Sequence, residues 1–98
     1  MGKCITITVK KREIPTTPVI VDIKSDKQTY YIGDIAYIKI TFKGEGGNKE
    51  IWKKLCLYID EYKVADKDVL VYPNKTQSTT FAIKLEREGV RRICAGWC

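Results

Sequence analysis

Apolar and polar residues alternate most regularly over residues 28–44, which read QTYYIGDIAYIKITFKG. After the turn pair Gly33-Asp34, every second residue is apolar and the residues between are mostly polar. The apolar set is Ala36, Ile38, Ile40 and Phe42. This period of two is typical of an antiparallel strand with one buried face. The stretch is predicted to be the central strand of a β-sandwich.

Shorter stretches follow one another along the rest of the chain, most with the same period and one, residues 69–72, continuously apolar. They cover residues 4–10, 19–24, 55–59, 62–65, 69–72, 79–85 and 90–97, and prolines, glycines or acidic turns separate them. In the second of these stretches, Val19, Val21 and Ile23 are expected to face inward. No stretch has the period of a long helix. About seven short strands in 98 residues indicate one all-β domain over residues 1–98, a sandwich of antiparallel strands.

The chain is basic, with a net charge of +6, and it contains no histidine. Because histidine is the commonest general base near neutral pH, and no metal-binding or triad pattern replaces it, no enzymatic activity is expected. Lysines on outward strand positions serve solubility and hinder edge-to-edge pairing. The alternative is a basic surface that binds nucleic acid with Tyr37 and Tyr58 as stacking rings. Its candidate residues are Lys39, Lys43, Lys54, Lys84 and Arg92.

Four short motifs resemble, in their order, the cell-adhesion-related family called CARDB, an immunoglobulin-like β-sandwich. They are YIGD at residues 31–34, LYIDE at 57–61, VLVYPN at 69–74 and GVRRICA at 89–95. Arrestin-like and macroglobulin-type sandwiches share the first motif. The resemblance covers residues 18–97 and implies an immunoglobulin-like sandwich of about seven strands. It implies a non-catalytic module with an interaction or structural role.

The family pattern continues into one more strand, whereas this sequence ends at Cys98 and has an additional predicted strand at residues 4–10. The inward residues of that strand are Ile5, Ile7 and Val9. We expect the strand to lie beside residues 90–97, either within the chain or by exchange between two copies. Otherwise a protein partner would take the place, because an unpaired edge is a docking or aggregation site.

The family topology makes the strands of Cys56 and Cys94 neighbours, so a cross-strand disulfide between them is the alternative to the expectation that the thiols are unpaired. Cys4 and Cys98 complete the set, and because no C-x-x-C pair is present, neither zinc nor another cofactor is expected. No secretory signal or membrane-spanning apolar stretch is recognisable. A full-length chain would be cytoplasmic, and a piece of an exported protein extracellular. Many Lys, Glu and Ile with few amides are a thermophile-like tendency.

Overall fold

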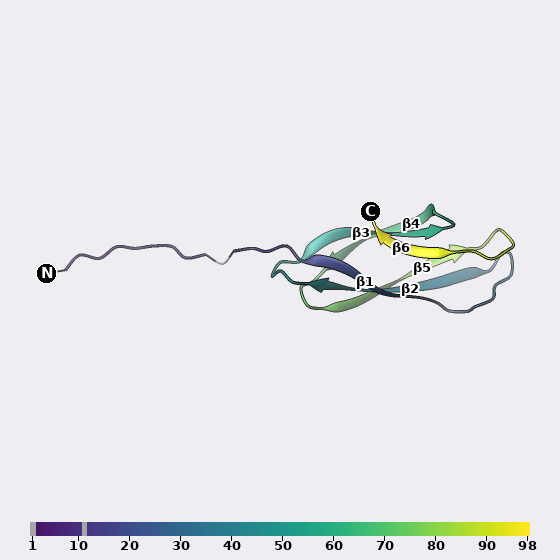
Figure 1. Ribbon diagram of the computed structural model, residues 1–98, viewed down its shortest axis with the longest axis horizontal. Coiled ribbons are helices and arrows are strands. Elements are labelled where there is room, and N and C mark those ends of the chain that lie inside the picture. Colours follow the sequence, from purple (N-terminus) through teal and green to yellow (C-terminus); the bar gives the residue numbers. More distant parts are fainter. Residues whose placement is uncertain (1, 11) are drawn as a thin grey trace.

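The computed structural model describes residues 2–10 and 12–98, and its strands form two sheets (Figure 1). One sheet contains β1 (Thr17–Ser25), β2 (Ile35–Glu45) and β5 (Thr76–Lys84) in the order β1-β2-β5. The other contains β3 (Ile51–Ile59), β4 (Tyr62–Val71) and β6 (Ile93–Trp97) in the order β4-β3-β6. All strand pairs within these sheets are antiparallel, and the described residues contain no helix. The all-β prediction is confirmed.

β2 lies in the middle of its sheet, as predicted. Its inward residues Ala36, Ile38, Ile40 and Phe42 are between 0% and 2% exposed. Phe81 of β5 pairs with Ile38 and adds to the same face. The alternation read from the sequence therefore identifies the buried face of this strand correctly.

The core is shared by both sheets, which face each other. Leu55 and Leu57 of β3 and Val71 of β4 are fully buried in the same cluster as the β2 residues. Trp97 of β6 packs edge-on against Phe42, with ring centroids 5.7 Å apart. Each strand thus contributes one apolar face, and together these faces bury a single core.

In β1, the residues that face the core differ from those predicted. Ile20 pairs with Phe42 and Asp22 pairs with Thr41, so that Val21 is the extra residue of a β-bulge. Ile20 packs against the core, whereas Val21 is 52% exposed. The expectation that the odd-numbered residues all face inward is therefore wrong for this strand. A bulge shifts the alternation by one residue, and the sequence carries no sign of it.

The two stretches at residues 62–65 and 69–72 are one continuous strand, β4, which pairs with β3 from Ile51 to Ile59. Polar residues separate the two stretches in the sequence. They lie on the exposed edge of the sheet, where Asp68 pairs with Lys54 across the ladder. An edge strand tolerates such a polar run because water solvates its outer face and side.

The sheets approach closely near Gly44, at the end of β2. A side chain there would contact the carbonyl oxygen of Tyr72 and the Cγ2 methyl of Thr16. Thr16 is itself buried, and its Oγ1 donates a hydrogen bond to the backbone oxygen of Lys49 at 2.7 Å. This position therefore requires glycine because of the close packing.

Residues 2–10 form an extended segment, called the arm below, which projects from one end of the folded part (Figure 1). Ile5, Ile7 and Val9 are 87%, 72% and 86% exposed, and no ladder pairs with them. The expectation that residues 4–10 fill the place beside β6 within the chain is wrong. The described residues therefore contain six strands in the sheets, in place of the expected seven. Exchange between copies stays a prediction.

Candidate functional site

The free edge of β6 carries a row of unpaired backbone groups. β6 pairs with β3 on one side and has no neighbour on the other among the described strands. The N–H of Cys98 donates to the oxygen of Lys54, and the N–H of Asp60 donates to the oxygen of Arg92. Because hydrogen-bonded and non-hydrogen-bonded pairs alternate, the even-numbered residues face β3. The N–H and C=O groups of Ile93, Ala95 and Trp97 therefore point to the free edge.

The two long sides of the molecule differ in how the sheets are joined. On one side, β4 lies next to β5, and Gln77 bridges them by donating to Leu70 O at 2.9 Å and accepting from Tyr72 N–H at 3.1 Å. Lys67 Nζ donates to Thr80 O at 2.7 Å. On the other side, β1 lies next to β6, and the described residues make no hydrogen bond between these strands. We call this second side the open side.

A groove with a volume of about 920 Å³ lies at one end of the open side. Its apolar lining includes Ile23 of β1, Ile93 of β6 and Leu85, which follows β5. The groove also reaches Ile38, a core residue only 1% exposed. Val90 lines the groove and is fully exposed. Apolar side chains that entered this groove would extend the core of the domain, and such exposed apolar surface is typical of an interaction site.

One wall of the groove is the loop between β1 and β2, and its shape is fixed by hydrogen bonds. Tyr30 Oη donates to Asp26 Oδ1 at 2.5 Å, which lowers the pKa of Asp26, while burial raises the pKa of Tyr30. Gly33 has a φ of 94° and donates its N–H to Leu85 O at 2.7 Å. The motif at residues 31–34 is thus a turn that fixes the wall to the end of β5.

The start of β6 is fixed by the turn between β3 and β4. Asp60 and Glu61 have φ values of 49° and 72°, as in the tight turns of two-residue hairpins. Asp60 Oδ1 accepts the N–H of Arg92 at 3.1 Å, and Oδ2 pairs with Arg91 Nη1 at 3.1 Å. The hydrogen bond from the Arg92 backbone, with the Arg91 guanidinium, lowers the pKa of Asp60. The free edge is therefore held in a defined position.

At the other end of β6, Trp97 has a buried donor without an acceptor. Its Nε1 is the one buried side-chain nitrogen or oxygen with no hydrogen-bond partner within the described part of the chain. A buried N–H without a partner destabilises a fold by about 1–3 kcal/mol. The indole N–H of Trp97, the last residue of β6, thus lacks an acceptor within the single domain.

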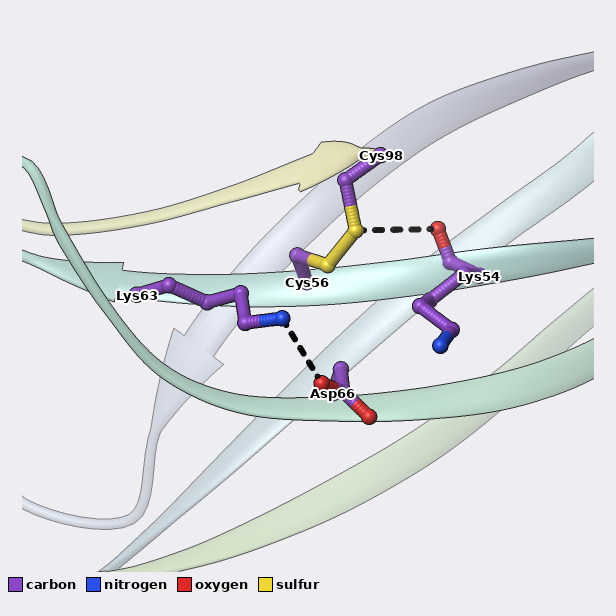
Figure 2. The surroundings of a disulfide bond; sticks show 5 residues. All are labelled: Lys54, Cys56, Lys63, Asp66 and Cys98. Atoms are coloured by element: carbon purple, nitrogen blue, oxygen red, sulfur yellow. Dashed lines mark hydrogen bonds and ion pairs between the residues drawn. A yellow bond between two sulfur atoms is a disulfide. The ribbon is translucent and has the colours of Figure 1, made fainter.

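A disulfide lies on the outer face of the second sheet, but its partners differ from those of the predicted alternative (Figure 2). Cys56 is bonded to Cys98, with Cα atoms 6.1 Å apart, and Cys94 is a free thiol. The expectation of unpaired thiols is therefore wrong for Cys56 and Cys98, and the alternative of a bond between Cys56 and Cys94 is wrong as well. The register places neither cysteine directly opposite Cys56, because Gly96 lies opposite Cys56 and Cys94 lies opposite Tyr58. Cys94 in β6 and Cys98 directly after β6 are both diagonal to Cys56. The bond is made by Cys98, which lies beyond the last ladder pair.

The disulfide covers the middle of β3. Cys56 is fully buried although it lies on the outer face, since it sits in the central strand with the disulfide beside it. On the neighbouring strand, Lys63 Nζ pairs with Asp66 Oδ2 at 2.9 Å and lowers the pKa of that carboxyl (Figure 2). The free thiols Cys4 and Cys94 are exposed and partly exposed, respectively. Within residues 2–10 and 12–98, no cluster of three metal-ligating side chains occurs.

The five candidates for a basic surface do not come together. Lys39 and Lys43 lie on β2 and Lys84 lies on β5, in one sheet. Lys54 lies on β3 in the other sheet, and Arg92 directly precedes β6. The sheets face each other across the core, so their outer faces point in opposite directions. Together, the five residues form no single groove for a nucleic acid strand.

The root of the arm, residues 12–16, is attached to the loop between β2 and β3. Asn48 Nδ2 donates to Arg12 O at 2.8 Å, and Asn48 Oδ1 accepts the N–H of Ile14 at 2.8 Å. Lys49 adds an ion pair with Glu13 at 2.7 Å, which raises the pKa of Lys49. These contacts join residues more than thirty positions apart, and no local pattern indicates them. Sequence reasoning missed this anchor for that reason.

Comparisons with known proteins returned no similar protein: no family model, no curated protein and no solved structure matches this chain. Among the described residues, no helix is long and apolar enough to cross a membrane.

Proposed function

We propose that this protein is a non-catalytic module that acts through protein–protein contacts, with the free edge of β6 and the adjoining groove as its contact surface. One observation carries the proposal. The backbone groups of Ile93, Ala95 and Trp97 are unpaired along a strand that borders a groove into the core. Addition of an extended strand to a free sheet edge is a recurring mode of recognition, in which the main chain supplies affinity and side-chain pockets supply specificity.

The strand order supports a sandwich of the immunoglobulin-like type. In such folds the first, second and fifth strands share one sheet, the third and sixth share the other, and a seventh strand lies beside the sixth. This chain has β1, β2 and β5 in one sheet and β3 beside β6 in the other. It differs in the fourth strand, because β4 pairs with β3, whereas the fourth strand of the constant-type fold lies in the sheet of the first, second and fifth strands. The position beside β6 has no occupant among the described residues. The resemblance to CARDB domains, which predicts a further strand there, agrees with this assignment.

A disulfide also bears on where such a module would act. Structural disulfides persist mainly in oxidising locations and in proteins of hyperthermophiles. The bond between Cys56 and Cys98 therefore favours the extracellular alternative over the cytoplasmic one, or a thermophilic source.

A pair of proline variants tests the proposal. Ala95→Pro removes a backbone donor that points to the free edge of β6, and edge strands tolerate proline at such positions. Ala82→Pro is the matched control, because Ala82 lies on the edge strand β5, opposite Tyr37. With the chain as bait in extracts of its source cells, we expect partners that the wild type and Ala82→Pro retain and Ala95→Pro loses. Equal recovery with both variants would contradict the proposed surface.

A further inference from the structure

We propose that the strand added to β6 is residues 4–10 of a second copy of this chain. The inference rests on the proposed function for the acceptor edge and names its occupant. The donor is the arm, whose apolar side chains Ile5, Ile7 and Val9 are exposed in the single chain. Three exposed apolar residues at every second position, in a segment without a pairing partner, indicate a segment that pairs as a strand with a sheet outside its own chain.

The donor segment, residues 4–10, matches the acceptor strand β6 in length and in the spacing of its inward apolar side chains. Residues 4–10 contain neither glycine nor proline and would span about 23 Å as a strand. β6 presents three residues toward the core side, Ile93, Ala95 and Trp97, and the arm presents three apolar residues at the same spacing. With these side chains turned inward, Thr6 and Thr8 face solvent. The polar face of the arm would then continue the outer face of β6.

The arm leaves its own chain at the end opposite the groove. β1 begins at Thr17, next to the end of β2 at Glu45, and runs toward Ser25. The groove lies at the Ser25 end, where β6 begins with Ile93. Figure 1 shows the arm leaving from the opposite end and pointing away. Asn48 holds the root at this end, and the arm lies against no strand of its own chain, so we assign the acceptor to another molecule.

The arrangement also accounts for the open side. The β4–β5 side is joined by Gln77 and Lys67, whereas the β1–β6 side has no such bridge in the described part of the chain. A strand placed beside β6 would pair with its free backbone groups and cover the groove. Copies that donate at one end and accept at the other form either a reciprocal dimer or a longer chain.

Two lysine variants of the full chain test the donor. Ile7→Lys places a charge on the inward face of the arm, and Thr6→Lys places the same charge on the outward face. Both positions are exposed in the single chain, so neither change disturbs the fold. Sedimentation over a range of concentrations should show that the wild type and Thr6→Lys associate. Association of Ile7→Lys should be weaker by at least about tenfold, because one apolar side chain loses its burial.

A second measurement tests the acceptor. The backbone amides of Ile93, Ala95 and Trp97 should exchange with deuterium rapidly in Ile7→Lys and slowly in the associated wild type. A labelled peptide of residues 2–12 should bind to Ile7→Lys, whose own arm is disabled but whose β6 is intact. The same peptide should not bind when Ala95→Pro is added to that variant.

Three outcomes would overturn the inference: a wild type that stays monomeric at all concentrations, association that Ile7→Lys leaves unchanged, or association that Ala95→Pro leaves unchanged. These results are distinguishable from failure of the proposed function. If association fails but Ala95→Pro still loses partners from extracts, the edge is a docking site for another protein. If neither test responds to Ala95→Pro, the proposed function fails as well.

Discussion

Loss of the disulfide should strongly destabilise the domain, and Cys98→Ser is the change that tests it. Cys56 and Cys98 are 42 positions apart. In the chain-entropy treatment, closing a loop of this size restricts the unfolded chain and stabilises the folded one by about 4 kcal/mol. A domain of this size has a total stability of about 5–15 kcal/mol, so this loss would remove a large part of it. The midpoint of urea unfolding should fall by more than about 1 M.

The variant is chosen so that other effects stay small. Cys98 is exposed, so a serine hydroxyl there remains in water. The thiol left at Cys56 is buried and behaves as a small apolar group. Cys94→Ser is the matched control and should leave stability nearly unchanged, since this thiol is free. Because Cys94 is also diagonal to Cys56, the variants are compared with and without a reductant.

The assay is equilibrium urea unfolding followed by tryptophan fluorescence, with peptide mapping of the non-reduced protein to identify the bonded pair. Reduced wild type and Cys98→Ser should unfold at the same urea concentration, well below the oxidised wild type. If oxidised wild type and Cys98→Ser agree to within about 1 kcal/mol, the bond does not constrain the unfolded chain in this way. A map that joins Cys56 to Cys94 would refute the pairing itself.

Three further changes have defined outcomes in the same unfolding assay. Gly44→Ala should destabilise by about 1–3 kcal/mol through overpacking, whereas Gly2→Ala, which has no atom within 4 Å of the added Cβ, should have no effect. Glu61→Gly should stabilise by up to about 1 kcal/mol, because its φ of 72° is unfavourable for a side chain. The pKa of Asp60 is lowered in the folded state, so its contribution is present above the unfolded value of 3.8 and is lost as the pH falls through the folded value. Asp60→Asn should remove this part of the pH dependence, and equal pH profiles for the two proteins would contradict the assignment.

The local alternation of apolar and polar residues correctly predicted the buried faces of the strands β2 and β3. The alternation around Ile38 and Ile40 identified the buried face of β2, and the same reading identified the buried residues Leu55 and Leu57 of β3. A strand with one buried face has to alternate, because successive side chains point to opposite faces. The β1 phase was missed, since the bulge at Val21 changes the pairing without changing the composition.

The candidate site was only partly predictable. The motif comparison predicted a further strand beside residues 90–97, and β6 has no second neighbour among the described strands. The prediction that Ile5, Ile7 and Val9 fill this place within the chain is wrong, because the three side chains are exposed. The disulfide partner was not predictable, because the register that places Gly96 opposite Cys56 and Cys94 opposite Tyr58 exists only once the two strands are paired. Register is a property of two strands together, and neither strand carries it alone.

The sequence by itself determined that this protein is made of β-strands, that the apolar faces of β2 and β3 are buried, and that apolar and polar residues alternate over residues 4–10. Only the tertiary structure decided that this segment points away from its own domain and pairs with neither sheet. The reason is the set of hydrogen bonds from Asn48 to Arg12 and Ile14, which joins distant parts of the chain at the end opposite the groove. Periodicity records which face of a segment meets the core, whereas the direction in which a segment leaves the fold depends on contacts that form only after the sheets have assembled.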